Sequence, residues 1–322
     1  MTAFGYTMMT EQSRPDQLVR DLVGAEAAGF EFSVCSDHYQ PWLAEQGHAG
    51  YAWSILGAAA QATERIGLMT YVTCPTIRYH PAIVAQKAAT LGILSGDRFR
   101  LGFGAGENLN EHVVGERWPA VGLRHEMLSE AVQIIGALLD GESSVNFRGE
   151  HFGVEQAKLW DLPDKRVPIG IAVSGEQSCG LAGRRGDLMI AVEPLRELTE
   201  MFDAAGGAGK ARVGQLALCY DEDRETAVQR AHEQFRWFGL GWKVNADLPN
   251  PESFAGATQF VTPSQVAEAI SCGPDLEEHV EAIRPFLDAG FTEVALVQIG
   301  GEHQVPFLAW AQDELLPALR SL

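Results

Sequence analysis

Short apolar runs alternate with stretches of helical periodicity along the chain, and this alternation limits the fold more than any other feature. The apolar runs cover residues 3–8, 32–37, 65–73, 99–106, 167–175, 187–194, 213–221 and 294–300. Stretches in which apolar residues recur at helical spacing lie between them, for example 15–30, 82–94 and 124–139. Apolar strands buried on both faces, with helices between them, indicate a parallel sheet. Eight such units in 322 residues predict an α/β protein with a (β/α)8 TIM barrel. An open doubly wound sheet is the second interpretation.

Two segments interrupt the alternation. Residues 143–155 alternate in polarity around Arg148 and Gly149, which predicts an inserted β-hairpin. Residues 239–263 are rich in Gly, Pro and Asn and have no clear period, so we expect a long loop over one face of the barrel. No internal repeat and no linker is visible, and we therefore expect one domain over residues 1–322.

The net charge and the apolar content limit the classes of partner. The chain is 46% hydrophobic and 21% charged, with a formal net charge of −19, which is the composition of a soluble globular protein with a large core. Binding to nucleic acid or to an acidic membrane requires a basic surface, so we expect neither partner. An anionic ligand is still possible, because backbone N–H groups can form a local anion site.

The cysteines and the first residues of the chain indicate a reducing compartment. None of the five cysteines lies in a CxxC pair, so we expect free thiols and no metal bound through cysteine. Residues 1–15 lack a basic region followed by an apolar one, and no stretch is apolar enough for long enough to span a bilayer. We expect a cytoplasmic protein.

Polar residues that can carry chemistry follow the predicted strands. Functional groups of a barrel collect at the carboxyl ends of its strands. Glu11 follows the first run; Asp37, His38 and Trp42 follow the second; Tyr71, Val72 and Cys74 end the third; Glu107 and Asn110 follow the fourth; and Ser174 and Gly175 follow the fifth. The sequence therefore predicts that these residues meet at one mouth of the barrel.

One histidine and two glutamates around one mouth can move protons. The ordinary pKa of histidine lies near neutrality, so His38 suits a general acid or base. Each residue also has a plain interpretation: His38 as a solvated loop histidine, Glu107 as a helix-start carboxylate, and Glu11 as an exposed acid. The chain has no Walker loop, no HExxH and no nucleophile–histidine order. Acid and base groups beside the aromatic Trp42 suit a bound organic cofactor.

The motifs SDHYQPW, TYVTCPTIRYHPA, GAGENLNE and AVSG, in this order, resemble those of the luciferase-like barrels. More narrowly, they are similar to the deazaflavin-dependent (coenzyme F420-dependent) oxidoreductases related to glucose-6-phosphate dehydrogenase. The resemblance runs nearly end to end and includes the CGPD segment and the final ELLPALR. It implies a luciferase-like barrel, coenzyme F420 as the cofactor and a homodimer.

The resemblance also implies a role for each site residue. His38 would take the hydroxyl proton of an alcohol, with Trp42 packed beside it and Glu11 as a second acid on the substrate side. Glu107 would donate a proton to the deazaflavin. Residues expected to contact the cofactor ring are Asp37, Tyr71, Val72, Cys74, Ala105, Gly106 and Asn110, with a non-prolyl cis peptide between Tyr71 and Val72. Residues expected to offer backbone N–H groups to the cofactor phosphate are Ser174, Gly175, Glu176, Gln177 and Cys179.

The sequence departs from the sugar-phosphate members of this group, which hold the substrate phosphate with lysines and an arginine. Glu193 and Pro194 stand where one such lysine is expected, and the helical stretch from Thr262 also lacks a lysine. An acidic group in a phosphate pocket would repel the substrate. We therefore expect an unphosphorylated alcohol or carbonyl substrate, with an apolar portion beside Trp237, Phe238 and Trp242. An FMN-dependent monooxygenase and a non-catalytic cofactor-binding barrel are the alternatives.

Overall fold

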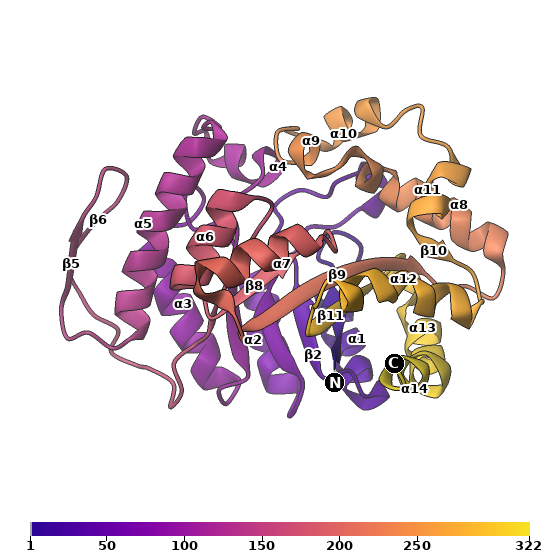
Figure 1. Cartoon of the computed structure of the whole chain (residues 1–322), viewed down its shortest axis with the longest axis horizontal. Coiled ribbons are helices and arrows are strands. Elements are labelled where there is room, and N and C mark those ends of the chain that lie inside the picture. Colours follow the sequence, from indigo (N-terminus) through magenta and orange to yellow (C-terminus); the bar gives the residue numbers. More distant parts are fainter. Residues whose placement is uncertain (1) are drawn as a thin grey trace.

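The computed structural model describes residues 2–322 and closes into a parallel barrel (Figure 1). Its eight strands are β1 (Ala3–Met8), β2 (Phe32–Cys35), β3 (Gly67–Thr70), β4 (Phe99–Phe103), β7 (Ile169–Ala172), β8 (Leu188–Ala191), β9 (Ala211–Cys219) and β11 (Glu293–Gln298). They pair in the order β9-β11-β1-β2-β3-β4-β7-β8, and the pairing of β8 with β9 closes the ring. The barrel prediction is confirmed, and the open sheet is excluded because β8 and β9 are hydrogen-bonded.

Helices surround the barrel as the apolar periodicity predicts. They are α1 (Pro15–Ala28), α2 (Ala52–Ala62), α3 (Pro81–Leu94), α5 (Val121–Leu139), α6 (Glu176–Arg185), α7 (Arg196–Phe202), α8 (Arg224–Phe235), α11 (Pro263–Ala269), α12 (Leu276–Asp288), α13 (Gln304–Trp310) and α14 (Leu316–Arg320). The ends of α1 follow from its sequence. Pro15 supplies a preset φ at its first position, and Gly29, at φ 99°, ends it in the left-handed conformation.

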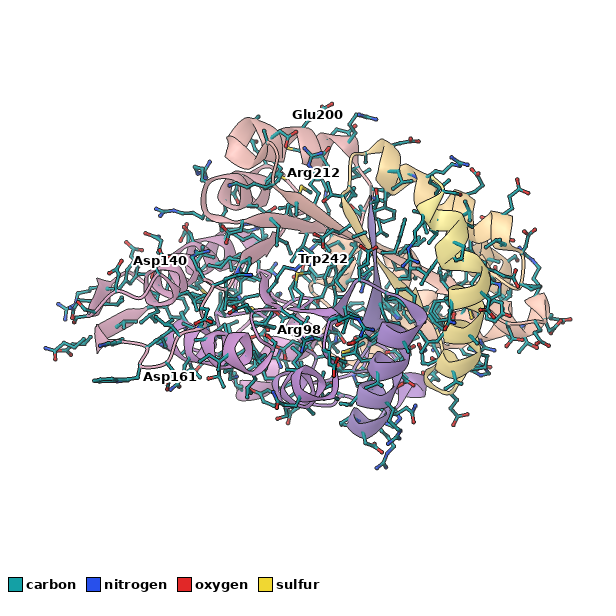
Figure 2. All side chains as sticks on the ribbon, turned by 90° about the horizontal axis from the view of Figure 1, so that it is seen from below. Arg98, Asp140, Asp161, Glu200, Arg212 and Trp242 are labelled. Atoms are coloured by element: carbon teal, nitrogen blue, oxygen red, sulfur yellow. The ribbon has the colours of Figure 1, made fainter. Side chains whose placement is uncertain are left out.

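The core has an inner and an outer layer. Seven buried strand residues form a cluster inside the barrel: Phe32, Val34, Met69, Leu188, Ile190, Val213 and Ala295. The apolar stripe of α5, including Ile134, Ile135 and Leu138, is buried in the larger cluster between strands and helices. This stripe therefore belongs to the core of the single chain. Figure 2 shows the charged side chains of Asp140, Asp161 and Glu200 at the outer edge of the molecule.

The two interruptions have different outcomes. The predicted hairpin is present as the antiparallel strands β5 (Val145–Arg148) and β6 (Gly153–Ala157), which extend away from the barrel beside α5 (Figure 1). The prediction of a long loop over 239–263 is wrong, because the segment contains α9 (Trp242–Asn245) and α10 (Pro251–Ala257). Asn250 caps α10 by accepting a hydrogen bond from the Ser253 N–H at 2.9 Å.

The segments that follow the strands gather at one end of the barrel. The short helix α4 (Asn108–Glu111) follows β4 and lies beside α9 in Figure 1. The Asn108 N–H donates to the Ala246 carbonyl at 2.9 Å, so the two segments are hydrogen-bonded. A two-stranded addition, β10 (Ser271–Cys272), pairs with the carboxyl end of β9. These segments frame the mouth at which the candidate residues lie.

Candidate active site

The imidazole of His38 lies between two carboxylates. Its Nδ1 is 3.4 Å from Glu11 Oε1, and its Nε2 is 3.4 Å from Glu107 Oε2. The three residues follow three different strands, β1, β2 and β4, as the sequence predicted. The His38 side chain is 8% exposed and the Glu11 side chain 1%, whereas the Glu107 side chain retains 14%. The arrangement is an enclosed acid–base cluster with its more open side at Glu107.

Glu11 is held by hydroxyl groups from the neighbouring strand ends. Its Oε2 accepts hydrogen bonds from Ser36 Oγ and, at 3.1 Å, from Thr10 Oγ1. The backbone N–H of Thr10 in turn donates to Ser36 Oγ at 2.9 Å. These contacts fix the Glu11 carboxylate against β2, the strand that carries His38. Glu11 is therefore a buried member of the cluster, which excludes its interpretation as an exposed acid.

Glu107 is an acid with a raised pKa. Burial raises the pKa of this carboxyl, and the charges of Glu11 and Glu111 raise it further, while His38 and Arg78 act in the opposite direction. The Nδ2 of Asn110 donates to Glu107 Oε2 at 3.0 Å. A carboxyl that keeps its proton above the ordinary acid range can act as a proton donor.

Asn110 joins Glu107 to the loop of His38. Its Oδ1 accepts from the backbone N–H groups of Tyr39 at 2.8 Å and Gln40 at 3.3 Å, while its Nδ2 serves Glu107. The carbonyl of Gln40 is 3.2 Å from His38 Nδ1. If this carbonyl accepts the Nδ1–H, the lone pair of the imidazole is on Nε2, which faces Glu107. The network thus favours one tautomer of His38.

Asp37 is enclosed by donors from the chain itself. Its Oδ2 accepts from Thr73 Oγ1 at 2.7 Å and from Trp53 Nε1 at 3.3 Å, and its Oδ1 accepts from the Tyr79 hydroxyl at 3.1 Å. Burial and then the charge of Asp37 raise the pKa of Tyr79, so the phenol keeps the proton that it donates. With both carboxylate oxygens engaged, the side chain of Asp37 anchors the loop of His38.

Aromatic side chains form one wall beside His38. The ring centroids of His38 and Trp42 are 4.9 Å apart. Trp42 stacks on Trp237 and meets Phe254 edge-on at 5.2 Å. Phe238 and Trp242 pack partly buried against the same cluster. The structure therefore brings together the aromatic residues that the sequence assigned to an apolar substrate portion.

Residues 71–74 and 104–106 approach one another closely. The peptide bond between Tyr71 and Val72 is cis, as the resemblance implied. Gly106 has φ 84°, and a Cβ at this residue would lie 2.5 Å from Cys74 Sγ. A side chain is thus excluded at Gly106 both by its conformation and by its neighbour. Ala105, the residue before Gly106, is half-buried.

Comparison with known proteins decides the family. Residues 1–293 match the family model "Luciferase-like monooxygenase". The F420-dependent glucose-6-phosphate dehydrogenase of Nakamurella multipartita is 36% identical over 333 residues, which cover 99% of this chain and 97% of that protein. This chain belongs to the F420-dependent oxidoreductases of the luciferase-like family.

Other relatives of this oxidoreductase carry different substrate names. The F420-dependent hydroxymycolic acid dehydrogenase of Mycobacterium tuberculosis is 35% identical over 324 residues, covering 98% of this chain and 84% of that protein. A solved F420-dependent secondary alcohol dehydrogenase, in complex with an F420–acetone adduct, has 29% identity and a TM-score of 0.89, with 99% of both chains covered. The relatives share a coenzyme in their names and differ in the alcohol.

The start of α6 provides fewer free amides than the resemblance implied for this oxidoreductase. The N–H groups of Ser174 and Gly175 donate to Ser178 Oγ at 3.0 and 3.3 Å, and the Cys179 N–H donates to the Gly175 carbonyl at 3.0 Å. The amides of Glu176 and Gln177 lie in the first helical turn, where no preceding helical carbonyl can accept from them. These two amides are therefore the best candidates for an anion contact.

The sequence interpretation missed a group of polar residues in the loop between β3 and α3. Thr73, Arg78 and Tyr79 all contact Asp37, and Arg78 also pairs with Glu111. Their signal was present, because they belong to the TYVTCPTIRYHPA motif. Only the strand-end residues of that motif were assigned a role.

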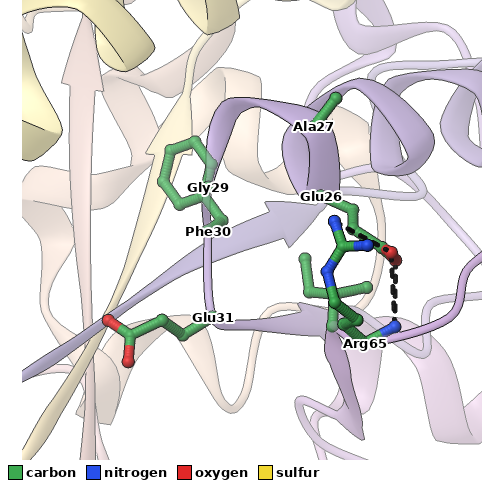
Figure 3. A pocket seen from close by; sticks show the side chains of 7 residues that line it. Glu26, Ala27, Gly29, Phe30, Glu31 and Arg65 are labelled. Carbon is green, nitrogen blue, oxygen red and sulfur yellow. Dashed lines mark hydrogen bonds and ion pairs between the residues drawn. The ribbon is translucent and has the colours of Figure 1, made fainter.

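A hollow lies away from the acid–base cluster. It has a volume of about 410 Å³ and lies where Gly29 and Phe30 meet Arg65 and Ile66, before strands β2 and β3 (Figure 3). Glu26 accepts from the backbone N–H groups of Glu64 and Arg65 at 3.0 and 3.2 Å, and these bonds hold the two loops together. The hollow therefore marks a joint between loops at the opposite end of the strands.

Within residues 2–322, no group of three or more His, Cys, Asp or Glu side chains is arranged to hold a metal ion. No helix in this same part of the chain has the length and apolar character needed to cross a membrane.

Proposed function

We propose that this F420-dependent oxidoreductase transfers a hydride between an unphosphorylated secondary alcohol and its coenzyme, with the corresponding ketone as product. One observation carries the proposal: His38 Nε2 lies 3.4 Å from Glu107, whose pKa is raised by burial. A secondary alcohol gives up hydride only if its hydroxyl proton also leaves, so a base must lie near the carbinol. An imidazole with its lone pair on Nε2 fills this role.

The residues at the mouth fit the coenzyme. The close packing of Gly106 on Cys74, the amides of Glu176 and Gln177, and the carboxyl of Glu107 with its raised pKa supply a fixed backbone segment, an anion contact and a proton donor for the proposed reaction. When bound, coenzyme F420 accepts or returns the hydride. Residues 37, 71, 72, 74, 105, 106 and 110 are the proposed ring contacts. Asp37 is the least suited of them, because both its carboxylate and its carbonyl accept hydrogen bonds within the chain.

Each residue of the cluster then has one task. His38 accepts the hydroxyl proton on Nε2, while Glu11 faces Nδ1 and stabilises the imidazolium that forms. Glu107 donates its proton toward the coenzyme side of the mouth. Trp42 limits the space beside His38 and excludes water. In this scheme each proton passes between a side chain and a bound molecule, from the hydroxyl group to His38 and from Glu107 to the coenzyme.

Two observations support an unphosphorylated substrate. The wall of Trp42, Trp237 and Phe254 is apolar, and the segment after β8 carries an exposed glutamate, Glu193, at the position where the resemblance implied a lysine. Opposite charge is the main requirement of a phosphate site, so a carboxylate there disfavours glucose 6-phosphate. The five buried free thiols suit a reducing compartment, and a cytoplasmic homodimer is part of the proposal.

A binding and turnover experiment tests the function. The purified protein is titrated with coenzyme F420 and, separately, with FMN, and binding is followed by fluorescence. Isopropanol, larger secondary alcohols and glucose 6-phosphate are then offered with F420, and reduction is followed by the loss of absorbance of the oxidised coenzyme. F420 binding with reduction by the alcohols alone is the expected result. Preference for FMN would favour a monooxygenase, and turnover of glucose 6-phosphate alone would overturn the substrate class.

A further inference from the structure

Arg78 connects the segment of His38 to the segment of Glu107. The residue lies in the loop between β3 and α3, and its side chain is 7% exposed. Its Nη2 donates to the carbonyl of Asp37 at 2.7 Å, and its Nε donates to Glu111 Oε1 at 2.8 Å. The backbone N–H of Arg78 also donates to Glu111 Oε2 at 2.9 Å. One residue therefore holds two segments that are far apart in the sequence.

The two anchor points lie next to the reacting groups. Asp37 directly precedes His38, and Glu111 lies on α4, four residues after Glu107. On the other side of His38, Asn110 binds the backbone N–H groups of Tyr39 and Gln40. The loop is thus tied to α4 both before and after the imidazole, and Arg78 forms the tie that precedes it.

A contribution to stability alone does not account well for the buried pair of Arg78 and Glu111. A buried ion pair is often no more stabilising than a well-packed apolar pair, because both charges lose their hydration. The chain has a second arginine–glutamate pair, Arg100 with Glu293, whose two guanidinium hydrogen bonds are 2.9 and 2.6 Å long. That pair joins the start of β4 to the start of β11, at the end of the barrel away from the mouth. It provides a matched comparison for the pair at the mouth.

We propose that Arg78 and Glu111 are positioning residues that set the separation between the His38 imidazole and the Glu107 carboxyl. This inference rests on the proposed function for its kinetic consequence. Neither residue needs to touch the substrate. Arg78 acts through the Asp37 carbonyl, and Glu111 acts by orienting Arg78.

The pair also contributes to the electrostatics of Glu107. The charged groups that act on this carboxyl are His38 after β2, Glu11 after β1, Glu111 on α4 and Arg78 in the loop after β3. Glu111 raises the pKa of Glu107, so the isosteric substitution Glu111→Gln should lower it. Because Glu107 acts as the acid in alcohol oxidation, the decline of kcat at high pH should then shift to lower pH.

The kinetic test compares Arg78→Lys with Arg100→Lys. A lysine keeps the charge and the backbone N–H bond to Glu111. Its single ammonium lacks the planar, fixed set of donors by which the guanidinium reaches Glu111 Oε1 and the Asp37 carbonyl together. Misplacement of a catalytic group by about 1 Å can cost about 100-fold in rate, so we expect a loss of kcat of about this size in Arg78→Lys, with a smaller change in KM. Arg100→Lys should keep the wild-type kcat. Equal kcat values in the two variants would overturn the inference.

A crystallographic comparison makes the inference independent of activity. Structures of the wild type, Arg78→Lys, Glu111→Gln and Arg100→Lys would give the distance from His38 Nε2 to Glu107 Oε2 in each protein. We expect this distance to change in the first two variants and to stay the same in Arg100→Lys. An unchanged distance in both Arg78→Lys and Glu111→Gln would overturn the positioning role. If none of the tested alcohols supports F420 reduction by the wild type, the proposed function fails. The crystallographic result still decides this inference in that case.

Discussion

Trp237 stacks on Trp42, with ring centroids 4.1 Å apart and ring planes 10° from parallel. Trp42 in turn contacts the imidazole of His38. Trp237 lies in the short helical segment after α8, in the second half of the chain. This part of the chain thus supports the aromatic residue beside His38.

Replacing Trp237 should change which alcohols fit beside Trp42. Trp237→Leu removes an aromatic pair and leaves space behind Trp42, so we expect a stability loss of about 2–3 kcal/mol in urea unfolding. The relative kcat/KM for larger secondary alcohols should rise over that for isopropanol. Trp160→Leu is the matched control, because Trp160 is 85% exposed on the hairpin side. The same alcohol preference in both variants would show that the wall has no part in selection.

His38→Ala should separate chemistry from coenzyme binding. Loss of a general base typically costs about 10²- to 10⁴-fold in rate, and we expect kcat to fall within this range. The affinity for F420, measured by fluorescence titration, should remain close to that of the wild type. Turnover that survives the substitution would exclude His38 as the base.

Glu107→Gln should abolish proton donation at this residue and make the stability of the protein less sensitive to a rise in pH above the ordinary acid range. Because burial raises the pKa of Glu107, the folded protein holds this proton at a pH at which the unfolded chain releases it. Stability therefore falls as the pH rises from the ordinary acid range through the folded pKa. Glutamine cannot ionise, so Glu107→Gln removes this loss of stability. Above the ordinary acid range, we expect the variant to unfold at a higher temperature than the wild type. In acid, we expect the two unfolding temperatures to converge. A uniform destabilisation at every pH would contradict this account.

Gly106→Ala should be more harmful than the same change at a glycine of equal φ. Gly106 and Gly115 have φ values of 84° and 85°, but only Gly106 has a neighbour, Cys74 Sγ, in the position of a Cβ. The left-handed conformation costs an alanine of the order of 1 kcal/mol at either residue, and the clash adds about 1–3 kcal/mol at Gly106. Urea unfolding of the two variants measures the difference. Equal losses of unfolding free energy in the two variants would mean that the loop carrying Cys74 moves aside at no cost.

Glu193→Lys tests the charge argument on the substrate. The residue is exposed after β8, and a lysine there supplies the cation that a phosphate site needs. We expect a measurable gain in binding of glucose 6-phosphate, followed by calorimetry. Glu197→Lys, with the same charge change at an exposed residue of α7, is the control. No gain at residue 193 would mean that the pocket differs from a phosphate site at more than one place.

Periodicity predicted the barrel but could not predict its shortest elements. The run 3–8 coincides with β1, because a buried strand reads as a continuous apolar run. The helices α9 and α10 have four and seven residues, and fewer than two turns show no clear 3.6-residue period. The two-residue strand β10 has no readable pattern either. The prediction of a loop over 239–263 failed for this reason.

The residues of the candidate site also differ in how far local sequence spacing predicts them. His38, Glu107 and Glu11 were predictable because each directly follows an apolar run. Arg78 lies several residues beyond its strand, in a loop where a charged residue is usually solvated, and its burial depends on contacts with Asp37 and Glu111 from other parts of the chain. Such contacts between distant segments have no signature in local spacing.

The near-equal distances from the two nitrogens of His38 to Glu11 and Glu107 have a consequence for the direction of the reaction. Under the proposed function, oxidation of an alcohol loads a proton onto the imidazole, and reduction of a ketone unloads it. Glu11 and Glu107 lie beside the ring in either charge state, so no change of partner is needed. We therefore expect the same residues to serve both directions, with the ratio of oxidised to reduced coenzyme deciding which direction runs.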